Sequence, residues 1–221
     1  SVKVSSRDLG GALARGLAGA TTVAASVRVC GLAGIRFFAT GGIGGVHRGH
    51  PEDVSADLEE MARSPVAVFC AGAKIVLDLR LTLERLESLA VPVLGFGTDE
   101  FPAFYSAHSG LPVGLRVDGS RQCAEVLAAG WAAGGRGAIV AVPPPTELEG
   151  ADEMALRAAE EQGGVTGGAV TPHLLARMAE LSGGRSVDVN VDLVINNARV
   201  AAEVAQAFSG AQAPNFLQEG T

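Results

Sequence analysis

The sequence predicts an α/β fold in which a largely parallel sheet carries helices on both faces. Short apolar runs alternate with longer segments of helical pattern along most of the 221 residues. Such alternation makes each helix a crossover between parallel strands, and crossovers cover both faces of a sheet. With 48% apolar residues and 30 glycines, the chain can bury a sizeable core, so a single domain over residues 1–221 is expected.

Five apolar runs are the expected strands: residues 1–4, 35–39, 66–70, 92–96 and 138–142. Helical spacing follows at residues 7–17, 22–32, 79–89 and 187–208. Ser55, a good N-cap, starts another helix. Thr171 and Pro172 fit the N-cap and first position of a helix that Gly183 ends. Residues 143–168 form the least apolar and most Glu-rich stretch, which predicts an excursion with one exposed helix rather than a domain boundary.

A glycine-rich segment, TGGIGGVHRG at residues 40–49, directly follows the expected strand at 35–39. Glycine amides can approach a ligand closely, so a strand that ends in such a loop suits an anion, with Thr40, His47 and Arg48 as further donors. The glycine spacing is neither that of a dinucleotide-binding fingerprint nor that of a P-loop. Taken alone, the segment fits a tight turn as well as a ligand loop, and His47 fits a structural histidine as well as a ligand.

Lys74 comes just after the expected strand at 66–70, and ligands collect at the carboxyl ends of parallel strands. We therefore expect Lys74, Asp53, Asp57 and the glycine segment to lie within reach of one small molecule. The neighbours of Lys74 are apolar, and burial lowers the pKa of an amine toward the nucleophilic form that Schiff-base chemistry uses. The alternative is a surface lysine at a helix start. For Asp53 and Asp57 the alternative is helix capping.

Composition and charge argue against several classes of protein. A net charge of −7 disfavours a nucleic-acid polymer as partner, because a phosphate backbone binds a basic face, but it leaves a small phosphorylated ligand open. Since no apolar run is long enough to span a bilayer and no leader is visible, we expect no membrane association and a cytoplasmic location. The three cysteines, Cys30, Cys70 and Cys123, lie among apolar neighbours, which predicts core residues rather than disulfides or a zinc site.

Eight motifs follow one another along the chain: KVSSRD (3–8), TTVA (21–24), TGGIGGVHRG (40–49), DVSADL (53–58), CAGAK (70–74), GTDEFPAFY (97–105), TPHLLARMAELSGG (171–184) and NNA (196–198). Together they resemble the pseudouridine-5'-phosphate glycosidase family, also called the indigoidine synthase A-like family. The resemblance covers nearly the whole chain, and several long motifs in one order make it specific.

The resemblance implies a set of site residues and a cofactor. Lys74 corresponds to the family's nucleophile, and Asp53 to the ligand of a divalent metal, Mn²⁺ or another such as Mg²⁺. The implied substrate-binding positions are Lys3, Val23, Ser55, Ala56 and Asp57, with Asn196 and Asn197 at the pyrimidine. Of the two asparagines, Asn197 is the preferred match. The resemblance also implies a homotrimer.

The implied reaction is the reversible cleavage or formation of the carbon–carbon bond between ribose 5-phosphate and uracil. A leaving carbon has no lone pair that protonation could use, so the electron-poor anomeric carbon must be stabilised in another way when the bond breaks. An amine that attacks the anomeric carbon and opens the ring provides this stabilisation through a covalent adduct.

Three positions depart from the family pattern: Ile75 stands in place of serine, His173 in place of phenylalanine, and Pro144 interrupts a P-I-P motif. They keep open a second hypothesis, a C-glycosynthase that attaches ribose 5-phosphate to another aromatic acceptor. A third is a non-catalytic sugar-phosphate-binding protein. The family's general-acid glutamate has no counterpart here; we expect that an N-terminal segment of the intact protein is missing, the alternative being a different route of proton transfer.

Overall fold

The computed structural model describes residues 2–161, 163, 165 and 170–209, and its centre is a five-stranded parallel sheet. The strand order is β3 (Phe37–Ala39), β6 (Ala67–Cys70), β10 (Ala138–Ala141), β8 (Val93–Phe96) and β9 (Leu115–Val117). Every neighbouring pair in this sheet is parallel. The predicted parallel sheet is therefore confirmed, and four of the five expected runs form strands within it.

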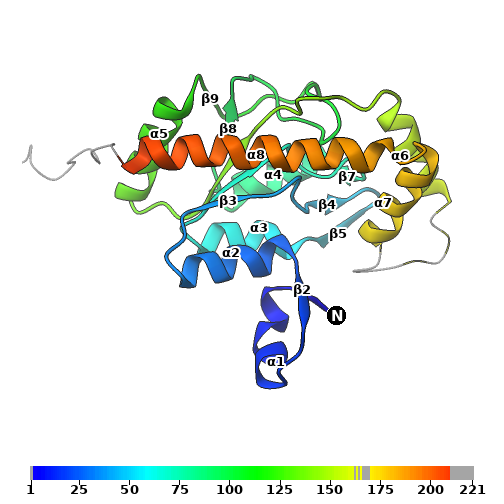
Figure 1. Ribbon diagram of the computed structural model, residues 1–221, viewed down its shortest axis with the longest axis horizontal. Helices are drawn as coiled ribbons and strands as arrows, with labels where there is room; N and C mark the ends of the chain where they lie inside the picture. Colours follow the sequence, from blue (N-terminus) through cyan, green and yellow to red (C-terminus); the bar gives the residue numbers. More distant parts are fainter. Residues whose placement is uncertain (1, 162, 164, 166–169, 210–221) are drawn as a thin grey trace, which may run out of the picture.

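Helices cover both faces of the sheet, as predicted. One face packs against α2 (Val23–Leu32), α3 (Ala56–Arg63) and α4 (Leu79–Ser88), and the other against α5 (Ser120–Ala132) and α8 (Arg185–Ser209). Figure 1 shows α8 on one side of β3 and α2 and α3 on the other. Alternation along β6 assigns the faces, because Val68 and Cys70 join the first cluster while Ala67 and Phe69 join the second.

Two smaller sheets lie outside the central one. β5 (His50–Val54), β4 (Val46–His47) and β7 (Leu77–Asp78) form an antiparallel sheet in that order. β1 (Val2–Val4) pairs with β2 (Gly19–Thr21) in parallel, with η1 (Ser6–Asp8) and α1 (Leu9–Ala14) between them. Figure 1 shows this N-terminal unit projecting from the body of the molecule. Strands this short carry no periodicity, so sequence reasoning missed β2, β4, β5, β7 and β9.

Three expectations about helices need correction. The helix expected at residues 7–17 is broken into η1 and α1 and ends at Ala14, in a segment with glycines at 10, 11 and 16. α7 (Val170–Leu181) already includes Thr171 and Pro172, so these residues lie in its first turn and Thr171 is not the N-cap. α6 (Ala151–Glu160) is not an exposed helix, because three alanines along it are buried; residues 162, 164 and 166–168 of that stretch lie outside the described residues. Among the described helices, none has the length and apolarity that a membrane crossing requires.

Gly72 fixes the junction between β6 and the loop after β8. Its φ is +83°, and a Cβ placed there would overlap the carbonyl oxygen of Pro102. Only glycine meets both conditions, since the conformation disfavours side chains and the neighbouring atom belongs to the backbone. The loops after β6 and β8 can therefore pack this closely only through Gly72.

We predict that Gly72→Ala lowers the free energy of unfolding by about 3 kcal/mol or more, because it adds a backbone clash to a left-handed conformation. Gly34→Ala is the matched control, since Gly34 has a φ of +72° but open space around its Cβ. For the control we expect a loss of about 1–2 kcal/mol. Urea unfolding of both variants measures the difference, and equal losses would contradict the prediction.

Candidate active site

The glycine loop after β3 and the segment after β6 are joined by main-chain hydrogen bonds. Ala71 N donates to Gly41 O at 2.8 Å, and Ile43 N donates to Gly72 O at 3.1 Å. Lys74 N in turn donates to Ile43 O at 3.1 Å. The two loops therefore lie side by side at the carboxyl edge of the sheet, which brings Lys74 next to the glycine loop.

The Asp57 carboxylate ties the glycine loop to the start of α2. Its Oδ1 accepts a hydrogen bond from Ala24 N and its Oδ2 accepts one from Gly44 N, both at 2.8 Å. The side chain is buried, with 5% of its surface exposed. Ser55 Oγ caps α3 by accepting from Asp57 N at 3.2 Å, so the Asp57 carboxylate is not needed as a helix cap. Ala56, between them, is exposed.

Burial lowers the pKa of the Lys74 amine below its usual value. The nearby Asp57 carboxylate opposes this shift by favouring the ammonium form. The positive charge of Lys3 on β1 lowers the pKa of Lys74 further. The structure thus brings Lys3, Asp57 and Lys74 into one electrostatic cluster from three different elements. The chain contains only two lysines, Lys3 and Lys74, and sequence reasoning missed this signal.

His47 joins the small antiparallel sheet to α7. Its Nδ1 lies 3.1 Å from Asp53 O and 3.3 Å from the Asp53 carboxylate, and its Nε2 lies 3.3 Å from Thr171 Oγ1. Both ring nitrogens therefore already have protein partners, which matches a structural histidine beside a carboxylate.

The Asp53 carboxylate is 43% exposed, so water and substrate can reach it. Within the described part of the chain, no three His, Cys, Asp or Glu side chains gather as metal ligands. The described residues therefore do not fit an all-protein metal cage; a hard cation such as Mg²⁺ or Mn²⁺, which keeps most of its waters, needs as few as one carboxylate.

Arg48 and Thr40 make structural contacts. Arg48 Nε donates to Leu77 O at 3.0 Å and Arg48 Nη2 donates to Ile75 O at 2.9 Å. Thr40 N donates to Phe69 O at 3.0 Å, which continues the β3–β6 pairing into the glycine loop. Val23 is the first residue of α2 and is half-buried.

Asn197 and Asn196 lie on different faces of α8. Asn197 is fully buried, and its Nδ2 donates to Thr40 O at 2.8 Å, while its Oδ1 has no partner among the described residues. Asn196 points elsewhere, since its Nδ2 donates to Pro143 O at 3.4 Å and its Oδ1 accepts from Arg199. The structure therefore brings Asn197, and not Asn196, to the glycine loop.

Sequence reasoning missed Asn190, which lies seven residues before Asn197 on the same side of α8. Asn190 is half-buried, and a Cβ on Gly41 would lie 2.6 Å from its Oδ1. The α-helical period places positions seven apart on one face, so this second amide could have been found from its spacing to Asn197.

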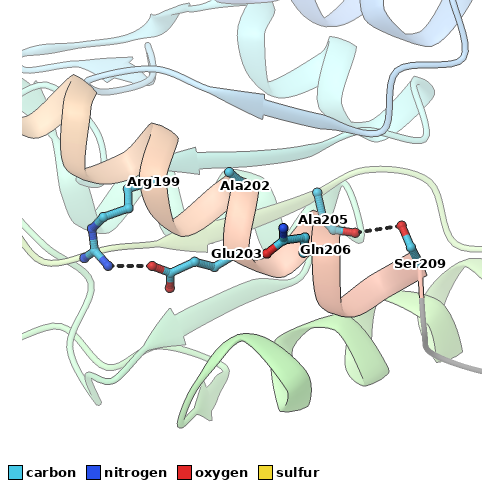
Figure 2. A pocket seen from close by; sticks show the side chains of 6 residues that line it. All are labelled: Arg199, Ala202, Glu203, Ala205, Gln206 and Ser209. Atoms are coloured by element: carbon cyan, nitrogen blue, oxygen red, sulfur yellow. Dashed lines mark hydrogen bonds and ion pairs between the residues drawn. The ribbon is translucent and has the colours of Figure 1, made fainter.

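Two hollows lie away from these residues. The first, in Figure 2, is a shallow depression on α8 lined by Arg199, Ala202, Glu203, Ala205, Gln206 and Ser209. The second lies at the amino ends of β8 and β10, beside Trp131 of α5. Neither contains a residue of the predicted site.

The charges around Lys74 predict how its reactivity depends on pH. Lys3→Met should raise the pH at which Lys74 reacts with a small amine-reactive label. The substitution removes a positive charge that disfavours the ammonium form of Lys74. Asp57→Asn should lower that pH, because it removes a carboxylate that favours the ammonium. Mass spectrometry of labelling across a pH series measures both shifts. Lys3→Arg keeps the charge and should leave the midpoint unchanged; a shift in that control, or shifts of the opposite sign, would refute the assignment.

The chain is similar to known proteins over most of its length. The model of the family described as indigoidine synthase A-like protein matches residues 1–207. A pseudouridine-5'-phosphate glycosidase of Herpetosiphon aurantiacus is 53% identical over 221 aligned residues, which cover 94% of this chain and 71% of that protein. The chain thus spans about seven-tenths of the length of this relative.

Two solved structures share the fold. One is the prealnumycin C-glycosynthase AlnA in complex with ribulose 5-phosphate, with a TM-score of 0.86 and 39% identity over 94% of this chain and 72% of that one. The other is an indigoidine synthase A-like protein from Thermotoga maritima, with a TM-score of 0.87 and 34% identity over 93% of this chain and 70% of that one. The family model and these relatives agree with the eight sequence motifs, and the chain belongs to the indigoidine synthase A-like family.

Proposed function

We propose that this chain acts as a pseudouridine-5'-phosphate glycosidase, which reversibly cleaves the carbon–carbon bond between ribose 5-phosphate and uracil. The observation that carries the proposal is the state of Lys74. Its main chain lies at the carboxyl edge of the sheet beside the glycine loop, and burial lowers the pKa of its amine. A lowered pKa makes more of the neutral amine available for covalent attack on a sugar.

Lys74 acts as the nucleophile at the anomeric carbon. Its nitrogen bonds to that carbon while the bond to the ring oxygen breaks, and the ring oxygen takes up a proton. The nitrogen lone pair then forms a C=N bond as the carbon–carbon bond to uracil breaks, and the uracil carbon receives a proton. Water hydrolyses the resulting iminium, which frees ribose 5-phosphate and regenerates the amine.

The surrounding residues hold the substrate and set the charge of the amine. Asp57 keeps Gly44 and the start of α2 in place next to Lys74. The ammonium of Lys3 and the glycine-loop amides are suited to a phosphate. Asp53 would hold Mn²⁺ or Mg²⁺, a cation that supplies positive charge to bound oxygen atoms.

The pyrimidine is recognised from α8 under this proposal. Asn197 Oδ1 is buried without a donor among the described residues, and such an acceptor gains free energy from a ligand N–H. Asn190 adds a second amide on the same side of the helix as Asn197 and takes the place that was predicted for Asn196.

A C-glycosynthase is the second candidate, because the fold neighbour AlnA carries that name. The three departures that raised this hypothesis do not open an acceptor site. Ile75 is 1% exposed in the core, Pro144 is buried, and His173 is exposed on α7. Curated relatives at 49–55% identity are named as glycosidases, which favours the first candidate. Homotrimeric assembly, which the family resemblance implies, and a cytoplasmic location, which the sequence predicts, are part of the same proposal.

The covalent adduct can be tested directly. With ribose 5-phosphate and borohydride, the intact protein should gain the mass of the reduced sugar phosphate on the peptide that contains Lys74. Lys74→Ala should lose both this label and uracil release from pseudouridine 5'-phosphate. Lys3→Arg is the matched control, because it removes the other lysine and keeps its charge. Labelling elsewhere, or an active alanine variant, would refute the proposal.

The outcomes also separate the three candidate functions. Uracil release together with the adduct supports the glycosidase. Adduct formation without uracil release indicates a C-glycosynthase with another acceptor. Binding of ribose 5-phosphate with neither adduct nor release indicates a non-catalytic sugar-phosphate-binding protein.

The metal assignment predicts different effects for two aspartates. Asp53→Asn should weaken binding of Mn²⁺ by about tenfold or more, because it removes the one carboxylate assigned as ligand. Asp57→Asn should bind Mn²⁺ normally and lose turnover, because its carboxylate holds the glycine loop and faces Lys74. Electron paramagnetic resonance of free Mn²⁺ measures binding independently of activity. Unchanged Mn²⁺ binding by Asp53→Asn, or activity that resists chelators, would rule out this site.

A further inference from the structure

Arg48 lies over the turn that follows Lys74. Leu77 N donates to Lys74 O at 2.9 Å, which closes a turn over residues 74–77. The guanidinium spans two carbonyl oxygens of that turn, at 2.9 Å from Ile75 O and 3.0 Å from Leu77 O. One planar, permanently charged group thus satisfies two acceptors on the same side of the turn.

The rest of this turn is already held on three sides. Lys74 N donates to Ile43 O of the glycine loop, and Leu77 pairs with His47 in the β4–β7 ladder. The side chains of residues 75–77 are buried in the core. The carbonyls of Ile75 and Leu77 are the groups that Arg48 holds from the outside, so Arg48 completes the restraint on the backbone that carries the reactive amine.

We propose that Arg48 is a positioning residue for Lys74 rather than a ligand of the substrate phosphate. The proposal rests on the proposed role of Lys74 as nucleophile. The Nε–Nη2 edge of the guanidinium, one of the two forks with which an arginine binds a phosphate, is committed to main-chain oxygens. Without the guanidinium the turn loosens, the amine samples positions away from the anomeric carbon, and water reaches it.

The test compares Arg48→Ala and Arg48→Lys with the wild-type protein. Lysine keeps the positive charge but cannot span two carbonyls with a planar fork. Both variants should trap ribose 5-phosphate on Lys74 at a maximal rate about tenfold lower, because a small displacement of a reacting group costs at least that much. The half-saturating concentration of ribose 5-phosphate should change by less than about threefold. Arg80→Ala, an exposed arginine at the start of α4, is the control and should change neither value.

A second readout needs no sugar. The pH midpoint of Lys74 labelling by a small amine-reactive label should rise in both Arg48 variants. Burial lowers the pKa of the amine, and an amine that water reaches loses this effect. The other charged groups that act on this amine, Asp57 from α3 and Lys3 from β1, stay in place in these variants.

The two measurements distinguish failure of this proposal from failure of the proposed function. If the wild-type protein traps no sugar, the proposed nucleophile is wrong, and the labelling midpoint still decides whether Arg48 holds the turn. The proposal is overturned if Arg48→Ala raises the half-saturating concentration tenfold or more at an unchanged maximal rate while Arg48→Lys restores it. It is also overturned if the midpoint stays unchanged in both variants. Since Arg48 is exposed, both variants should fold, and if the alanine variant does not, the lysine variant decides.

Discussion

The site depends most on the two main-chain hydrogen bonds that the Asp57 carboxylate accepts. The carboxylate is buried, and each of its oxygen atoms accepts a main-chain hydrogen bond, one from the start of α2 and one from the glycine loop. Hydrogen bonds to a charged group contribute about 1.5–3 kcal/mol each, which offsets much of the cost of removing the carboxylate from water. The same negative charge stabilises the ammonium form of Lys74. Asp57 thereby links the backbone geometry of the site to the protonation of its nucleophile.

The carboxyl edge of the sheet is built from loops that pack more closely than side chains allow. Gly72 lies against the backbone at Pro102, and Gly42 lies against the ring of Phe104. Phe104 itself has a φ of +65°, a left-handed conformation that costs about 1–2 kcal/mol for a residue with a side chain. Its N donates to Ala71 O at 2.9 Å, which ties it to the segment that leads to Lys74. Strain of this kind persists where the surrounding structure over-determines the conformation, as it does here.

Several candidate ligands have structural partners that the sequence could not show. His47 contacts Asp53 and Thr171 with its two ring nitrogens, and Arg48 bridges two carbonyl oxygens. Both residues contribute by placing Asp53 and Lys74, the groups proposed to meet the metal and the sugar. A glycine-rich loop flanked by polar side chains therefore need not use all of them on the ligand, because some are required to hold the loop itself.

The sequence by itself determined the fold class, the family and the edge of the sheet that carries Lys74. Apolar runs of four or five residues alternating with helical periods require a parallel sheet, and residues that follow neighbouring parallel strands share one edge. It could not predict the two-residue strands β4 and β7, whose pairing depends on partners about thirty residues away and leaves no local period. It also could not separate Asn196 from Asn197, because the rotation of α8 about its axis is set by packing against the sheet. Only the tertiary structure decided which polar side chains face the site, since burial and the pairing of donors with acceptors arise from residues distant in the chain.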